Sequence, residues 1–121
     1  MELSGKHVVV TGAAGGIGSA MARRFHAEGA RVVLSDLHGA DDVAAELPGS
    51  VSVAADMRSE SDVVALIEAA EAAFGPVDLY AANAGVAIGT DPMDDESVWE
   101  VSFDVNVHAH RWAARRLLPG W

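Results

Sequence analysis

The chain has 121 residues, half of them hydrophobic, with a formal net charge of −10 and no cysteine. This length and composition predict one globular domain, and the negative charge argues against nucleic-acid and anionic-membrane partners. Because cysteine is absent, disulfides and cysteine-ligated zinc are excluded. Neither a run of 18 apolar residues nor a signal-peptide pattern is present, so we expect a cytoplasmic protein without a membrane span.

The first half of the chain alternates between strand-like and helix-like segments. His7–Thr11 is rich in β-branched residues, as is typical of a buried strand, and apolar residues then recur at helical spacing over Ile17–Phe25. Gly29 ends that helix. Arg31–Ser35 is the second predicted strand, and Asp41–Leu47 is a short helix closed by a Pro-Gly pair.

The second half repeats this alternation and adds one long loop. In chain order, the predicted strand, helix, strand, loop and last helix cover Val51–Ala55, Ser59–Phe74, Val77–Ala82, Val86–Pro92 and Asp94–Leu118. Either Ser59 or Ser61 is suited to cap the first of these helices, and acidic residues favour the start of the last one. Strands that alternate with helices predict right-handed βαβ units and a parallel sheet.

The most informative motif is a glycine-rich turn between the first strand and the first helix. Gly12, Gly16 and Gly18 have the spacing Gly-x-x-x-Gly-x-Gly, and Gly15 adds a second, related pattern that the spacing does not distinguish. Gly12 suits a sharp turn, Gly16 a close approach of the backbone to a pyrophosphate, and Gly18 close packing of helix on sheet. No Gly-Lys-Ser/Thr follows, so a triphosphate site of the Walker type is unsupported. A glycine-rich turn without a ligand is the alternative.

Asp36 stands at the end of the second strand, where dinucleotide-binding folds place an acid. A carboxylate there accepts hydrogen bonds from both ribose hydroxyls and repels a 2′-phosphate, so it favours NAD over NADP. Neither Ala14 nor Leu37 supplies a cation for that phosphate. The alternative is an aspartate that faces solvent at the end of a strand.

Four motifs in chain order resemble those of the short-chain dehydrogenase/reductase family. They are the cofactor motif Thr11–Gly18, Asp56-Met57 after the third strand, Asn83-Ala84-Gly85 after the fourth, and Asn106 in the last helix. The resemblance covers the whole chain, and the four motifs together are specific where each alone is weak.

The resemblance implies a role for each matching residue. Gly12, Gly16, Ile17 and Gly18 would hold the pyrophosphate, Asp36 the adenosine ribose, Asp56 and Met57 the adenine, and Asn83, Ala84 and Gly85 would line the cofactor cleft. Asn106 would bend its helix and help to hold a water in a proton relay, which makes it the only catalytic candidate. The corresponding helix often contributes to a dimer interface in the family, so the resemblance also implies a homo-oligomer through the last helix.

The chain departs from the family in its catalytic residues. By the resemblance, members are about twice as long and carry a serine after a fifth strand, followed by Tyr-x-x-x-Lys. Here the only tyrosine is Tyr80, within the fourth predicted strand, and the only lysine is Lys6. We therefore expect a chain that corresponds to the N-terminal, cofactor-binding half of such an enzyme.

Other candidate sites in the sequence have plainer explanations. His108 and His110 are two residues apart on a predicted helix and face different directions, so no metal site is predicted. The last helix carries an apolar stripe that we expect to pack against the sheet, with Trp112 beside it and partly exposed. The stripe consists of Trp99, Phe103, Asn106, His110, Ala113 and Leu117.

Taken together, the sequence predicts an α/β fold: a truncated doubly wound, Rossmann-like parallel sheet of four strands in the order 3-2-1-4, in one domain over residues 1–121. The predicted function is that of the NAD-binding half of an oxidoreductase that transfers a hydride between nicotinamide and an alcohol or carbonyl. A substrate is expected only in a full-length parent, and the isolated chain is expected to be inactive. The alternatives are a non-catalytic dinucleotide-binding module, a half that works only with a partner chain, and another adenosine-cofactor protein such as a methyltransferase.

Overall fold

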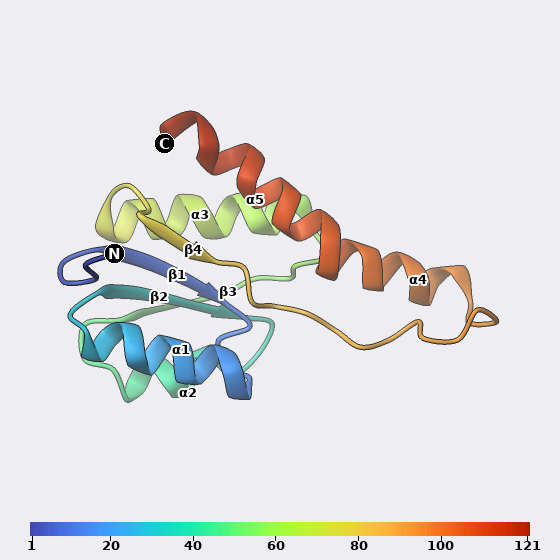
Figure 1. Cartoon of the computed structure of the whole chain (residues 1–121), viewed down its shortest axis with the longest axis horizontal. Coiled ribbons are helices and arrows are strands. Elements are labelled where there is room, and N and C mark those ends of the chain that lie inside the picture. Colours follow the sequence, from blue (N-terminus) through green and yellow to red (C-terminus); the bar gives the residue numbers. More distant parts are fainter.

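The computed structural model describes all 121 residues as a parallel sheet with helices on both faces (Figure 1). The four strands are β1 (His7–Thr11), β2 (Arg31–Asp36), β3 (Val51–Ala54) and β4 (Leu79–Ala81). They are hydrogen-bonded in the order β3-β2-β1-β4, and all three pairings are parallel. The predicted α/β class and the strand order 3-2-1-4 are therefore confirmed.

Two helical layers cover the sheet. One layer holds α1 (Gly16–Ala27) and α2 (Ala40–Ala45). The other holds α3 (Glu60–Phe74) and a long C-terminal helical segment. That segment comprises α4 (Glu96–Phe103), the π-helical turn η1 (Asp104–His108), α5 (Ala109–Leu117) and the 3₁₀ turn η2 (Leu118–Gly120).

The core forms two clusters because side chains alternate between the two faces of a strand. Val8 and Val10 of β1 pack with the residues of α1 and α2, whereas Val9 packs with α3, η1 and α5. All three valines are completely buried. Such continuous apolar strands are expected in a parallel sheet that helices cover on both sides.

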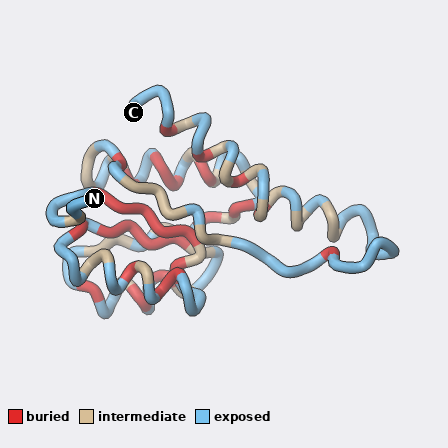
Figure 2. The backbone as a smooth tube through the Cα atoms, viewed as in Figure 1, coloured by how far each residue is buried: buried red, intermediate tan, exposed pale blue.

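The ends of two helices follow from capping side chains. Ser59 Oγ accepts a hydrogen bond from the Asp62 N–H at 3.3 Å, so Ser59 rather than Ser61 is the N-cap of α3. Asp95 Oδ1 accepts from the Ser97 N–H at 3.4 Å at the start of α4. In Figure 2, α4 and the loop before it extend beyond the body of the molecule, and no residue of α4 is buried.

The fourth strand is shorter than the predicted Val77–Ala82. At its start, the Asp78 carboxylate accepts a hydrogen bond from the His7 N–H at 2.8 Å, so a side chain replaces the ladder partner there. At its end, the Asn83 N–H donates to the Ala81 carbonyl at 2.8 Å and turns the chain out of the sheet. The strand is left with three residues.

The last helix is not the single α-helix that the periodicity predicts. The π-helical turn η1 interrupts it, and a π turn holds more residues than the 3.6 of an α-helix. The face that packs on the core therefore rotates, and the buried residues follow one another at a spacing of four: Val105, Ala109, Ala113 and Leu117. Ala113 and Leu117 of the predicted stripe are buried, but Phe103 is 53% exposed, so that part of the prediction is wrong.

No helix of the chain combines the length and the apolar composition that a membrane crossing requires.

Candidate functional site

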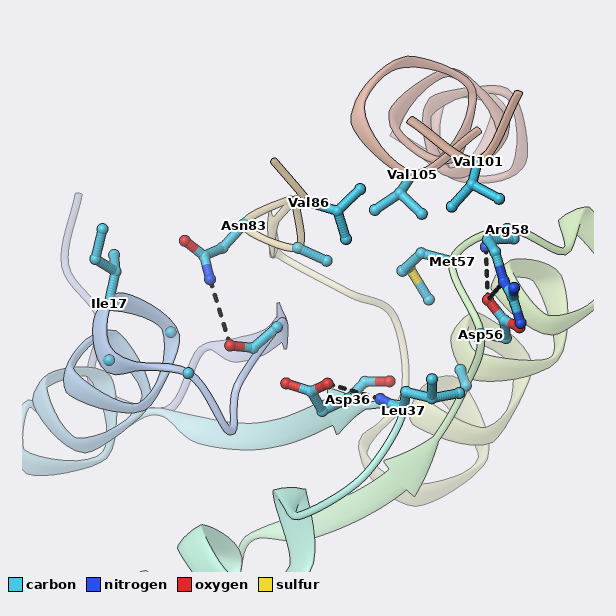
Figure 3. Close-up of a pocket in the computed structure, with 18 residues that line it drawn as sticks. Ile17, Asp36, Leu37, Asp56, Met57, Arg58, Asn83, Val86, Val101 and Val105 are labelled. Atoms are coloured by element: carbon cyan, nitrogen blue, oxygen red, sulfur yellow. Dashed lines mark hydrogen bonds and ion pairs between the residues drawn. The ribbon is translucent and has the colours of Figure 1, made fainter. Parts of the chain in front are cut away.

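A pocket of about 660 Å³ lies at the carboxyl ends of the strands, the edge at which open α/β sheets bind their ligands (Figure 3). All ten residues predicted to bind a cofactor line it. They are Gly12, Gly16, Ile17, Gly18, Asp36, Asp56, Met57, Asn83, Ala84 and Gly85. The turns after β1, β2, β3 and β4 thus meet around one cavity, as the parallel topology requires.

The glycine turn brings backbone segments closer together than any side chain permits. Gly12 has φ = 66°, a conformation that favours glycine. A Cβ on Gly18 would lie 2.0 Å from the Gly12 carbonyl oxygen and 2.7 Å from Asn83 Nδ2. The expected close approach of helix to sheet at Gly18 is confirmed. A Cβ on Gly16, in contrast, meets no atom within 4 Å, so the space beside that residue is open.

The first turn of α1 offers an anion-binding end. Its N-cap is Gly15, which has no side chain to accept a hydrogen bond, and its first turn contains no acidic residue. The N–H groups at the start of a helix lack intrahelical partners, and the helix dipole places positive charge there. Gly16, Ile17 and Gly18 of this turn line the pocket, which suits a diphosphate in the cavity.

Asp36 presents its carboxylate next to this turn. Oδ2 accepts a hydrogen bond from the Ala14 N–H at 3.0 Å, and Oδ1 accepts from the Leu37 N–H at 2.7 Å. These two backbone donors fix the carboxylate at the wall of the pocket, where it keeps further acceptor positions. A carboxylate with such free acceptors fits a pair of ribose hydroxyls.

The segment after β3 carries a charged pair. Asp56 accepts hydrogen bonds from the Arg58 guanidinium on both oxygens, and the shortest, from Nη2 to Oδ2, is 2.7 Å long. These hydrogen bonds from Arg58 hold the pKa of the Asp56 carboxyl below its usual range. Arg58 itself lines the pocket, and our sequence reasoning missed it although it stands only two residues after Asp56.

The turns after β1 and β4 are joined by Thr11 and Asn83. Thr11 Oγ1 accepts hydrogen bonds from the N–H groups of Asn83 and Ala84, each at 3.1 Å. Asn83 Nδ2 donates in return to the Thr11 carbonyl at 3.2 Å, and to the Gly12 carbonyl at 3.4 Å (Figure 3). This network joins the carboxyl end of β1 to that of β4 beside the pocket.

Asn106 is the one predicted site residue that does not line the pocket. It lies in η1, and its side-chain amide pairs with the backbone of Val86: Nδ2 donates to the carbonyl at 2.8 Å and Oδ1 accepts from the N–H at 2.9 Å. Nδ2 also donates to Ser102 Oγ at 3.2 Å. In this structure, the side chain therefore ties the C-terminal helical segment to the loop after β4.

Eight residues that line the pocket were not among the predicted ligand contacts. Two of them, Gly15 and Arg58, stand next to predicted contacts. The other six come from strand ends, loops and the last helical segment: Ser35, Leu37, Ala55, Val86, Val101 and Val105. Val101 and Val105 are four residues apart, a spacing that places both on one face of a helix. The predicted apolar stripe put a different face of this segment against the sheet, because it did not allow for the π turn.

The titratable residues considered for other chemistry lie outside the pocket. Tyr80 packs against the core from β4, and burial raises its pKa to about 12. His108 stacks on Trp112, with ring centroids 5.8 Å apart. No group of three or more histidine, aspartate or glutamate side chains is arranged to hold a metal ion.

The sequence matches a family model described as short chain dehydrogenase over residues 6–121. Among similar proteins is 3beta-hydroxysteroid dehydrogenase 1 of Eggerthella lenta, 44% identical over 115 residues, which cover 88% of this chain and 44% of that protein. Cis-4-hydroxycyclohexanecarboxylate dehydrogenase of Sinomonas cyclohexanicum is 41% identical over 106 residues, which cover 82% and 43%. The chain thus spans less than half the length of these relatives.

Solved structures agree with this match. A 3-ketoacyl-(acyl-carrier-protein) reductase from Brucella melitensis, complexed with NADH, aligns with a TM-score of 0.90 and 37% identity, over 97% of this chain and half of that one. A short-chain dehydrogenase/reductase from Burkholderia phymatum, in complex with NAD, aligns with a TM-score of 0.89 and 35% identity, over 98% of this chain and 45% of that one. By its sequence, its strand order and its glycine turn, the chain belongs to the short-chain dehydrogenase family.

Proposed function

We propose that the pocket binds NAD(H) and that the chain provides the cofactor-binding half of an oxidoreductase. The reaction would be hydride transfer between the nicotinamide and an alcohol or carbonyl substrate. One observation carries the proposal: an uncapped, glycine-lined helix start and a fixed carboxylate, Asp36, share one cavity. That combination suits a diphosphate joined to a ribose.

The strand order gives the proposed direction of the dinucleotide. The turn after β1 would hold the diphosphate, Asp36 at the end of β2 the adenosine ribose, and the segment after β3 the adenine. The turn after β4, where Asn83–Val86 line the cavity, would hold the nicotinamide half. When bound, the nicotinamide supplies the hydride chemistry, while the protein binds, orients and encloses the cofactor.

The relatives' names support a class of substrate for this proposal. Two of them are dehydrogenases of compounds that carry a hydroxyl group, a hydroxysteroid and a hydroxycyclohexanecarboxylate. We infer an alcohol/carbonyl pair on a small molecule for the full enzyme of which this half would be part. We also place the protein in the cytoplasm, which a sequence without cysteine permits.

A second candidate function is a non-catalytic dinucleotide-binding module, or a half that acts only with a partner chain. The observation that favours it is that neither Tyr80 nor Lys6 lines the pocket. An interface through the last helical segment would suit such a partner or a second copy, since Phe103 and Val107 are about half exposed. Sedimentation of the chain tests this part of the proposal.

Titration of the purified chain with NADH tests cofactor binding directly. We expect saturable binding by calorimetry, with ADP-ribose competing, because both contain the diphosphate and the adenosine ribose. Asp36→Ala should weaken binding at least about tenfold, equal to about 1.4 kcal/mol. As a matched control, Asp41→Ala removes an exposed aspartate of α2 that is not part of the pocket. No saturable binding by a folded chain would refute the proposal.

A further inference from the structure

Beyond the glycine turn and Asp36, the pocket is lined by a third segment, Asp56–Arg58, which follows β3. This segment differs from the other two because it contains a positively charged side chain. The strands lie in the order β3-β2-β1-β4, so the turn after β3 is next in line after the one that follows β2. With the diphosphate at the glycine turn and the ribose at Asp36, the purine base would face Asp56, Met57 and Arg58. Figure 3 shows these three side chains at one end of the pocket. The inference that follows rests on the proposed function.

Asp56 is already engaged by Arg58. Oδ1 accepts from the Arg58 backbone N–H at 2.9 Å and from Nε at 3.0 Å. Oδ2 accepts from Nε at 3.0 Å and from Nη2 at 2.7 Å. An ionised carboxylate has about four acceptor positions, so Arg58 occupies most of them. Asp56 is also the less accessible partner, since its side chain is 25% exposed and that of Arg58 is 51% exposed.

Arg58 is the only positively charged residue among the 18 that line the pocket, and Asp36 and Asp56 are the only negatively charged ones. No second cation competes with it for Asp56. Its planar guanidinium holds hydrogen-bond donors in a fixed fork and also stacks on aromatic rings. The edge offered to a base at this end of the cavity is therefore one of N–H donors.

We propose that Arg58 makes the pocket accept adenine and hypoxanthine alike, because it covers the acceptor edge of Asp56 with the donor edge of a guanidinium. The 6-position of adenine carries an amino donor, whereas that of hypoxanthine carries a carbonyl acceptor. A bare carboxylate favours the amino group and repels the carbonyl oxygen. A guanidinium donates to the carbonyl or to the ring nitrogens, and its flat face stacks on either base, so discrimination is lost.

The experiment compares NADH with reduced nicotinamide hypoxanthine dinucleotide, which differs only at the base. For the wild-type chain, we expect dissociation constants within about threefold of each other. For Arg58→Ala, Asp56 loses the guanidinium and keeps only the backbone N–H of residue 58, so Oδ2 becomes free. We then expect NADH to bind at least about tenfold more tightly than the hypoxanthine analogue. Loss of stacking on the guanidinium weakens the binding of both dinucleotides alike, so the ratio of their dissociation constants does not depend on stacking.

Two further variants isolate the cause. Arg24→Ala removes an arginine whose exposed ion pair with Glu28 on α1 lies outside the pocket, and it should leave the ratio unchanged. Asp56→Asn in the Arg58→Ala background removes the bare carboxylate, and it should bring the ratio back to within about threefold.

An Arg58→Ala ratio equal to that of the wild type overturns the inference while NADH binding, and with it the proposed function, stands. A wild-type preference for NADH of tenfold or more overturns it as well. If the folded wild-type chain binds neither dinucleotide, the proposed function fails and this inference fails with it. Circular dichroism establishes that each variant is folded, as we expect for a replacement at the half-exposed Arg58.

Discussion

At the scale of a single residue, we propose that Asp36 sets the choice between NAD and NADP. Its two backbone hydrogen bonds fix the carboxylate at the wall of the pocket, and under the proposed function its charge would repel a 2′-phosphate. We expect NAD to bind at least about tenfold more tightly than NADP, a difference of about 1.4 kcal/mol. Asp36→Asn should reduce this ratio, and calorimetry with both cofactors measures it.

The control for that prediction is Asp41→Asn, which removes one negative charge from α2 outside the pocket. It should leave the ratio unchanged, because the exposed Asp41 does not line the pocket and water and salt screen its charge. Equal affinity of the wild-type chain for the two cofactors would show that Asp36 does not have this role.

Replacing Gly18 and Gly16 by alanine distinguishes a glycine that the fold requires from one that we expect only the ligand to require. A methyl group on Gly18 would overlap the Gly12 carbonyl oxygen at 2.0 Å, so Gly18→Ala should lower the thermal midpoint strongly and abolish binding. Gly16→Ala meets no atom of the protein within 4 Å. It should leave the midpoint nearly unchanged and weaken NADH binding, because its methyl group fills the space proposed for the diphosphate. Thermal unfolding and calorimetry on both variants test this, and unaltered NADH affinity in Gly16→Ala would contradict it.

At the scale of elements, Asn106 joins η1 to the loop after β4. Asn106→Ala removes both hydrogen bonds to the Val86 backbone, each worth about 1 kcal/mol in net stability. The gain in helix propensity, about 0.7 kcal/mol at most, does not offset that loss. We expect a destabilisation of about 1–2 kcal/mol and weaker NADH binding, since Val86 lines the pocket.

Urea unfolding of the Asn106→Ala variant measures the stability change. Ser102→Ala is the matched control, because it removes only the third, 3.2 Å contact of the same amide. Ser102→Ala should lower the free energy of unfolding by less than Asn106→Ala does. If both replacements have the same small effect, the amide pair with Val86 does not hold the loop.

A comparison of the observed strands and helices with the predicted ones shows which features the sequence pattern predicts and which it does not. The first three strands lie within one residue of their predicted ends, because each is a short stretch rich in apolar residues that lies next to turn residues. Asp36 and Asp56 reach the same cavity because parallel strands end at one edge of the sheet. The π turn was not predicted, because a search for helical periodicity assumes 3.6 residues per turn throughout. Arg58 was missed because its role arises from a side-chain contact with Asp56 that no spacing rule describes.

At the scale of the whole molecule, β4 is an edge strand that pairs only with β1. An unpaired strand edge is a template for association with another chain. We expect the 121-residue chain to self-associate with increasing concentration, and analytical ultracentrifugation tests this. Ala82→Lys, which places a charge on an exposed residue next to the strand, should reduce the association. A monomer at all concentrations with a sharp two-state melt would contradict the prediction.

The last prediction concerns catalysis: the chain alone should not turn over an alcohol or a carbonyl. Reduction of a carbonyl needs a proton for the forming alkoxide, and a positioned acid contributes about 10²–10⁴-fold. Tyr80 is unsuited to this task, because it is packed in β4 with a pKa of about 12 and does not line the pocket. Lys6 precedes β1, at the end of the strand opposite the glycine turn. The Asn106 amide has no acidic proton near neutral pH, and it is bound to Val86.

NADH oxidation with a panel of ketones and aldehydes tests this prediction, with a mock purification as the background. We expect rates equal to that background, even at NADH concentrations that saturate the pocket. Tyr80→Phe distinguishes the sources of any activity, since it removes the only phenol of the chain. Turnover above background that persists in Tyr80→Phe would mean that another group delivers the proton. Turnover that Tyr80→Phe abolishes would mean that β4 moves enough to expose Tyr80 to the pocket. Either result would show that these 121 residues are sufficient for catalysis. Under the proposed function, the glycine turn, Asp36 and the turn after β4 would hold the cofactor, so a proton donor is the one further group that the reaction needs.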